Sequence, residues 1–169
     1  MKRALLCFLL ITALMTQLSF ADGDPGEYKP VTRNADTRTA FLSSVTEKNG
    51  HVYLTADDIQ WYEGEEANEK FREIERDPEM TEAPDGYYIV NEIEKYDTLE
   101  VADDAVVYMQ IYNRTGNVEE ADVVWNERIP LGKFVEQLQD ANEMDLKAFP
   151  YHLVVQDGKV VQITQQFIP

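Results

Sequence analysis

Acidic side chains are the groups in this chain best suited to bind a cation, and five of them crowd one segment. Calcium takes about six to eight oxygen ligands, which carboxylates supply. The segment lacks the Asp-x-Asp-x-Asp-Gly order of a calcium loop, so the same residues could equally form a turn followed by an acidic helix N-terminus. The candidate calcium ligands are Asp57, Asp58, Glu63, Glu65 and Glu66.

Aromatic side chains provide a second candidate site, for binding rather than catalysis. Neighbouring residues of a strand point to opposite faces, so one of Tyr87 and Tyr88 should face the core and the other should point outward. An outward tyrosine near Trp61 could stack on a sugar ring or anchor a protein partner, although ordinary packing would use the same residues. The candidate binding residues are Trp61, Tyr62, Tyr87, Tyr88 and Trp125.

The sequence holds no motif for nucleophilic or metal-dependent catalysis. There is no Gly-x-Ser-x-Gly elbow, and the only serines after residue 21 are Ser43 and Ser44. The two histidines, His51 and His152, form no His-Glu-x-x-His pattern, so zinc is not expected. Paired carboxylates can hydrolyse glycosidic bonds, which leaves a small hydrolase as a weak alternative. We expect no catalytic residues and no cofactor other than Ca²⁺.

Residues 1–21 have the pattern of a secretory signal peptide. Lys2 and Arg3 precede an apolar run, and Ser19 and Ala21 are small residues at the −3 and −1 positions of a cleavage site. The run is too short to remain as a membrane anchor. We therefore expect a protein secreted into the cell-wall space or medium, with no stable membrane insertion. The only cysteine, Cys7, lies within the signal, so the mature chain would be free of cysteine.

The charge of the chain limits its partners. All 32 acidic residues follow Ala21, where 13 Lys and Arg face them, a net charge of −19 for residues 22–169. Such a chain repels the phosphates of nucleic acids, so no nucleic-acid partner is expected. It suits a basic protein or a cation, and it also suits plain solubility.

The order of the segments predicts one domain. A polar leader with several Gly and Pro residues covers 22–39, and a globular domain covers 40–169. Hairpins are expected at Asn49-Gly50 and Asp157-Gly158, because these pairs tolerate the positive φ of type I′ turns. The expected opposite pairs are Val45 with Leu54, Val155 with Val160 and His152 with Ile163, with Phe41, Val45, Val52, Leu54 and Ala56 on one face and His51 on the other.

Hydrophobic periodicity predicts two amphipathic helices and several further strands. The helices cover 65–76 and 130–139, where apolar residues recur at helical spacing. The further strands cover 87–90, 98–101, 105–112 and 123–125. Hairpins favour antiparallel pairing over βαβ crossovers. The expected fold is α+β, a mainly antiparallel curved sheet or partly closed small β-barrel with two amphipathic helices.

Five stretches and the terminal proline resemble a known family. They are Trp61-Tyr62-Glu63-Gly64-Glu65-Glu66-Ala67, Gly86-Tyr87-Tyr88-Ile89-Val90-Asn91, Ala102-Asp103-Asp104-Ala105, and Pro150-Tyr151-His152-Leu153 with Val160-Val161-Gln162-Ile163 and Pro169. The family comprises small, uncharacterised exported proteins and lipoproteins of Gram-positive bacteria. The resemblance covers about residues 41–169 and implies a bacterial exported protein. It implies no functional residues, and this chain lacks the cysteine needed for a lipid anchor.

These observations favour a soluble, exported, acidic binding domain whose partner is a protein or a glycan. A secreted enzyme inhibitor or immunity-type protein that acts on a basic target is the alternative from another class. The carboxylate-based hydrolase is the third.

Overall fold

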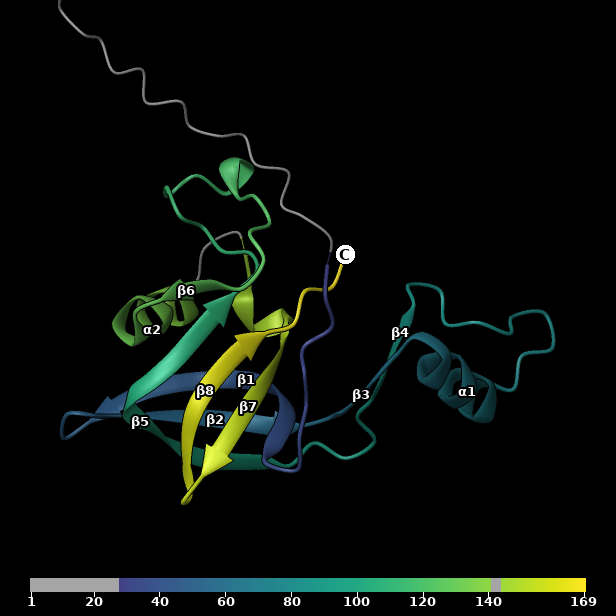
Figure 1. Ribbon diagram of the computed structural model, residues 1–169, viewed down its shortest axis with the longest axis horizontal. Coiled ribbons are helices and arrows are strands. Elements are labelled where there is room, and N and C mark those ends of the chain that lie inside the picture. The colour runs from purple at the N-terminus through teal and green to yellow at the C-terminus, as the bar shows by residue number, and fades with distance from the viewer. Residues whose placement is uncertain (1–27, 141–143) are drawn as a thin grey trace, which may run out of the picture.

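The computed structural model describes residues 28–140 and 144–169 (Figure 1). The predicted signal peptide and the first residues of the leader lie outside this part of the chain. In chain order the strands and helices are β1 (Thr37–Lys48), β2 (His51–Asp58), β3 (Gln60–Glu63), α1 (Gly64–Glu75), β4 (Tyr87–Val90), β5 (Tyr96–Met109), β6 (Glu127–Ile129), α2 (Leu131–Gln139), β7 (Pro150–Gln156) and β8 (Lys159–Gln165). Two short 3₁₀ turns lie at Val118–Glu120 and Leu146–Ala148.

Five strands close into a ring, which we call the barrel. The order of neighbours is β2-β1-β7-β8-β5, and β5 also pairs with β2. The 14 residues of β5 allow both contacts, since residues 96–101 pair with β2 and residues 100–101 and 106–108 pair with β8. The short strand β6 extends the sheet beyond β5. The predicted α+β fold with a partly closed sheet is confirmed.

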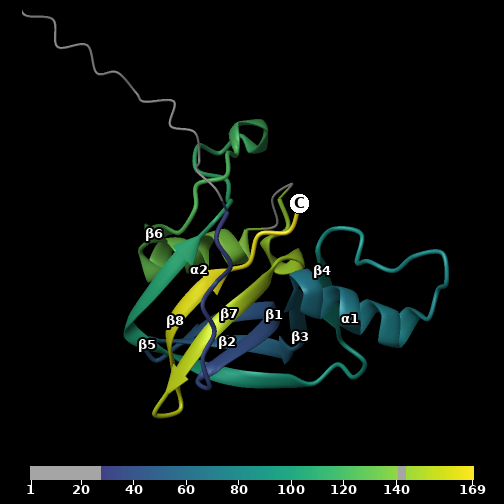
Figure 2. The same ribbon diagram turned by 45° about the vertical axis from the view of Figure 1, so that its right-hand side comes forward.

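One pairing within the barrel is parallel, and this sets the connectivity. Every neighbouring pair is antiparallel except β5–β8. The chain leaves β5 and passes through β6 and α2 to β7, and a hairpin then returns it to β8 beside β5 (Figure 2). A five-stranded Greek-key ring with this connectivity is the arrangement of OB-fold barrels. The topology does not by itself fix a function.

The two predicted hairpins are present, with β-bulges that change part of their register. Val45 pairs with Leu54 and Val155 with Val160, as predicted. The prediction that Phe41 faces the core was wrong, because a shift between Leu42 and Ser44 turns Leu42 inward instead.

The second hairpin shows the same effect. A shift between Val154 and Val155 places His152 opposite Thr164 rather than opposite Ile163, and Ile163 faces Leu153. Both errors have one cause, since each bulge adds a residue that strict alternation does not count.

The helix α2 closes the apolar core of the barrel. Its side chains Phe134, Val135 and Leu138 are buried, as the predicted stripe requires, and the Phe134 ring meets the Tyr151 ring edge-on at 5.8 Å. Pro130 stands at the N-cap, where its missing N–H is not needed. The core also contains residues from all five barrel strands, among them Leu42, Leu54, Val107, Leu153 and Ile163.

Residues 60–95 form a separate unit between β2 and β5, which we call the insert. It projects to the side of the barrel (Figure 1) and consists of α1 packed on the two-stranded sheet β3–β4. The helix and β4 match their predictions, whereas β3 was not predicted. Ala67 and Phe71 are buried as expected, but Ile74 is 41% exposed. On the exposed side of the helix, Lys70 pairs with Glu73.

Three further predictions need correction. Residues 123–125 form no strand, and this part of the chain pairs with β5 only further on, at β6. The strands expected at 98–101 and 105–112 are parts of the single strand β5, which ends at Met109. The leader expected to reach residue 39 overlaps β1, which begins at Thr37. Among the described residues, no helix has the length and apolar character needed to cross a membrane.

Candidate binding cleft

Strand alternation in the insert divides the aromatic residues between two faces. Tyr62 pairs with Tyr88, and both contact the small core of the insert around Phe71. Trp61, one residue earlier, faces the other way, as does Tyr87. Their rings stack at 4.8 Å with an interplanar angle of 14°. The prediction that Tyr87 and Tyr88 face opposite ways therefore holds, and the Trp61–Tyr87 pair forms one wall of a cleft.

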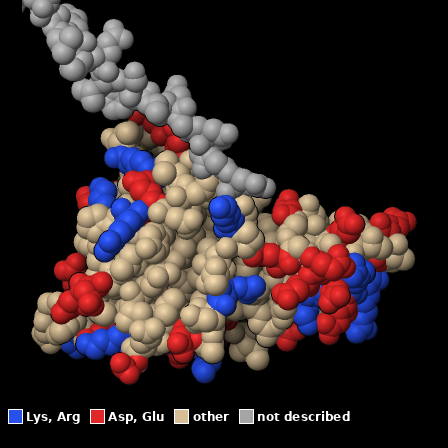
Figure 3. Space-filling model, viewed as in Figure 1, with Lys and Arg blue, Asp and Glu red and all other residues tan. Residues whose placement is uncertain are grey.

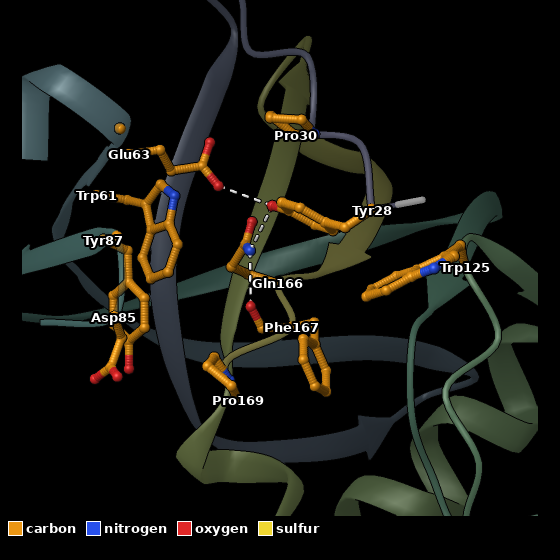
Figure 4. Close-up of a pocket in the computed structure, with 12 residues that line it drawn as sticks. Tyr28, Pro30, Trp61, Glu63, Asp85, Tyr87, Trp125, Gln166, Phe167 and Pro169 are labelled. Carbon is orange, nitrogen blue, oxygen red and sulfur yellow. Dashed lines mark hydrogen bonds between the residues drawn. The ribbon is translucent and has the colours of Figure 1, made fainter. Parts of the chain in front are cut away.

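The opposite wall comes from three segments that are distant in sequence. Tyr28 precedes the barrel, Trp125 lies in the loop before β6, and Phe167 follows β8. The Tyr28 and Trp125 rings lie 5.2 Å apart, and the Trp125 and Phe167 rings meet edge-on at 5.4 Å. A space of about 470 Å³ lies between the two walls. Figure 4 shows the residues that line it. This volume lies within the range of small-molecule sites.

A chain of hydrogen bonds forms the floor of the cleft, and its direction can be derived. Gln166 Nε2 donates to the carbonyl oxygen of Phe167 and to the Tyr28 hydroxyl, so Gln166 Oε1 is an acceptor. His152 Nε2 lies 2.9 Å from that oxygen and must carry the proton. His152 Nδ1 therefore accepts from the Thr39 hydroxyl, at 2.9 Å. The Tyr28 hydroxyl donates onward to Glu63 Oε1 at 2.8 Å.

This network joins the barrel, the insert and the segment that precedes β1. His152 is 2% exposed, and burial lowers its pKa. Burial, with the Glu63 carboxylate adding to it, raises the pKa of Tyr28 to about 12. The neutral form of both groups is thus favoured near pH 7, which keeps the donors and acceptors of the floor fixed.

The cleft carries negative charge and no positive charge among its described lining residues. Glu63 is half-buried in the wall, and Asp85 is exposed at the rim. Burial, and then the charge of Asp85, raise the pKa of Tyr87. Arg33 lines an adjoining hollow, where its Nη1 donates to the carbonyl oxygen of Trp61. The electrostatic character of the cleft is acidic and aromatic.

One polar atom of the cleft wall is unpaired. Trp61 is 3% exposed, and its Nε1–H has no hydrogen-bond partner in the described part of the chain. A buried donor left unpaired costs about 1–3 kcal/mol. Such groups are uncommon in folded proteins and warrant a functional explanation.

The candidate binding residues predicted from the sequence fall into two groups. Trp61, Tyr87 and Trp125 line the cleft together, whereas Tyr62 and Tyr88 lie beneath α1. Sequence reasoning missed Tyr28, Gln166 and Phe167. The signal for Tyr28 was a lone tyrosine in a polar leader, but nothing in the local sequence indicated that this leader folds back onto the barrel.

The candidate calcium ligands do not converge. Asp57 accepts hydrogen bonds from Asn91 Nδ2 and from the Lys95 backbone N–H, and Asp58 pairs with Arg38. Glu63 lines the cleft, and Glu65 pairs with Arg72. Within residues 28–140 and 144–169, no group of three or more His, Cys, Asp or Glu side chains is placed to hold a metal ion.

Comparisons with known proteins add no match. Neither a family model, nor a curated protein, nor a solved structure matches this chain. The geometry of the cleft and the sequence are therefore the two indications of function.

Proposed function

We propose that this protein is an exported binding module that holds its ligand non-covalently in the aromatic cleft. The observation that carries the proposal is the gathering of five aromatic rings, from the insert, the barrel ends and the preceding segment, around one cavity (Figure 4). Aromatic rings exposed in a concave site supply large contact areas at a small cost in side-chain entropy. The N-terminal signal pattern and the resemblance to exported bacterial proteins support the compartment.

Binding accounts for the cleft better than catalysis does. The Glu63 carboxylate, which a carboxylate-based hydrolase would use, accepts a hydrogen bond from the Tyr28 hydroxyl as part of the floor. Asp85, the other acidic side chain of the lining, is exposed at the rim. The hydrogen bonds of the floor hold the Glu63, Tyr28 and Gln166 side chains in fixed positions, which suits a ligand that binds between the walls without reacting.

The chain offers a direct test, because its two tryptophans, Trp61 and Trp125, both line the cleft. Intrinsic fluorescence should therefore change when a ligand enters. We would titrate the purified protein with cellotetraose, chitotetraose and choline. Tyr87→Leu should abolish the response of whichever probe binds, since it removes the stacked ring and leaves both tryptophans, the fluorophores that are followed, in place.

Tyr96→Leu is the matched control, because Tyr96 is 54% exposed and lies away from the cleft. It should leave the titration unchanged. An equal effect of the two variants, or a response that neither variant alters, would contradict binding in the cleft.

A second candidate function is inhibition of, or immunity to, a basic protein. The insert carries 12 acidic and 4 basic residues, and Figure 3 shows acidic side chains gathered over this projection. Ile74, Met80 and Ile93, three exposed apolar residues, lie on the same unit. A stoichiometric complex with a basic protein of the same medium, lost in Ile93→Lys but kept in Val124→Lys, would support this function. Val124 is exposed on the barrel side and serves as the control.

A further inference from the structure

We propose that the ligand of the cleft is a cation, specifically a quaternary or methylated ammonium group held against the aromatic rings. This inference rests on the proposed function, since it names the chemical class of ligand for the same cleft. A cation near the face of Trp, Tyr or Phe is attracted by the ring quadrupole, and Trp is the strongest partner. Both tryptophans of the chain are in this cleft.

The negative charge of the lining favours a positively charged ligand. Five aromatic residues and two carboxylates line the cleft, and the described lining has no Lys, Arg or His. An anionic ligand would meet Glu63 and Asp85 without a compensating cation. A neutral sugar could stack on the rings and donate hydroxyl hydrogen bonds to the carboxylates, but it carries no charge to offset theirs. A cation gains from both the rings and the carboxylates.

The placement of the rings suits a small cation whose surface is apolar. In Figure 4 the Trp61–Tyr87 pair stands on one side of the space, and Trp125 and Phe167 stand on the other. A group between these walls can approach aromatic rings from two sides. Attraction of this kind operates within about 6 Å of a ring centroid.

The polarity of the walls favours a methylated ammonium over a primary one. A primary ammonium carries three N–H donors, each of which needs an acceptor once water is excluded. Glu63 already accepts the Tyr28 hydroxyl through Oε1, and Asp85 lies at the exposed rim. A quaternary ammonium has no N–H to satisfy, and its methyl groups can contact the rings directly.

The test compares choline with 3,3-dimethyl-1-butanol, its uncharged isostere, at constant ionic strength. Binding is followed by tryptophan fluorescence and checked by calorimetry. Choline should bind at least about tenfold more tightly than the isostere, because the cation–π attraction depends on the charge. Equal affinity for the two compounds would overturn the ammonium proposal while leaving an apolar ligand cleft in place.

The oligosaccharide titrations separate the two proposals further. If cellotetraose or chitotetraose binds and choline does not, the cleft is a binding site and the ammonium proposal is wrong. If choline, the isostere and both oligosaccharides all fail to change the fluorescence, the proposed function is contradicted as well.

Two substitutions test whether choline binds in the cleft. Asp85→Asn removes a rim charge whose side chain forms no ion pair with the described residues, and should weaken choline about threefold without changing the affinity for the isostere. Asp104→Asn, the same change at an exposed carboxylate outside the lining, should leave both affinities unchanged. Equal weakening by the two variants would show that only the overall charge matters and would overturn the assignment of choline to the cleft.

Discussion

The barrel and the insert each contain an edge-on contact between a helix phenylalanine and a strand tyrosine, but the cores around the two contacts differ in size. In the barrel, Phe134 of α2 meets the Tyr151 ring edge-on at 5.8 Å. In the insert, Phe71 of α1 meets the Tyr88 ring edge-on at 5.6 Å. The barrel contact lies in a core of 18 buried apolar residues, whereas the insert core has three, Ala67, Phe71 and Ala83.

This difference in core size indicates that the barrel contributes most of the stability, whereas the insert contributes residues to the cleft. The stabilisation from apolar burial grows with the number of residues enclosed, so we expect the barrel to keep its fold when the insert opens. The insert cannot be stable to the same degree, yet it supplies Trp61, Glu63 and Tyr87 to the cleft. Binding elements are commonly drawn from the less stable parts of a structure. A ligand that contacts both walls would hold the insert in its position next to the barrel.

The largest expected effect comes from the barrel. Phe134→Ala removes a fully buried ring from the core and should lower the free energy of unfolding by about 3–5 kcal/mol. The measurement is urea denaturation followed by far-UV circular dichroism. Stabilities of single domains are about 5–15 kcal/mol, so this loss is a large fraction of the total. A change below 1 kcal/mol would show that α2 contributes little to the barrel.

The matched change in the insert should act locally. Phe71→Ala removes the central ring of the small core and should open residues 64–75 while the barrel stays folded. Amide hydrogen exchange should lose protection in α1 and keep it in β7 and β8. The urea midpoint of the barrel should move little, by less than about 1 kcal/mol in free energy. A loss equal to that of Phe134→Ala would mean that barrel and insert unfold as one unit.

A change in pH should have a smaller effect on stability, and this effect should come from His152 in the barrel. Burial lowers the pKa of His152 below its ordinary 6.5, so the unfolded chain binds the proton more readily than the folded one. Stability is therefore full above pH 6.5 and falls as the pH drops through that value towards the lower folded pKa. Between pH 7.5 and 6 we expect a loss of up to about 1 kcal/mol, measured by urea denaturation at each pH.

The other histidine provides the control for this prediction. His152→Gln should flatten the pH dependence in this window, whereas His51→Gln, which leaves the buried histidine in place, should retain it. His51 has a side chain 44% exposed. If the free energy of unfolding of His152→Gln still falls with pH in this window, other groups cause the pH dependence.

Local features of the sequence were predicted well because local chemistry determines them. Asn49-Gly50 and Asp157-Gly158 fix both hairpins through their positive φ angles, at 54° and 82° and at 50° and 80°. The stripes of α1 and α2 follow from helical spacing. The two β-bulges were missed, since an extra residue in one strand leaves no mark in an alternating pattern.

Long-range features of the cleft could be predicted only in part. The alternation of Tyr87 and Tyr88 was accessible because it depends on one strand. The meeting of Tyr28, Trp125 and Phe167 depends on three segments that come together only when the barrel has formed. The calcium candidates failed to converge for a related reason, because Arg38, Arg72 and Asn91 each engage one carboxylate.

The parallel pairing of β5 with β8 has a consequence for how the chain folds. The ring closes through the last strand, Lys159–Gln165, which must find a partner more than fifty residues earlier in the chain. Loop closure over such distances is slow, and barrels rich in distant pairings fold in milliseconds to seconds rather than microseconds. The barrel cannot close before its final strand has been synthesised. Until β8 has been synthesised, β5 and β7 lack the strand that joins them, and the ring stays open.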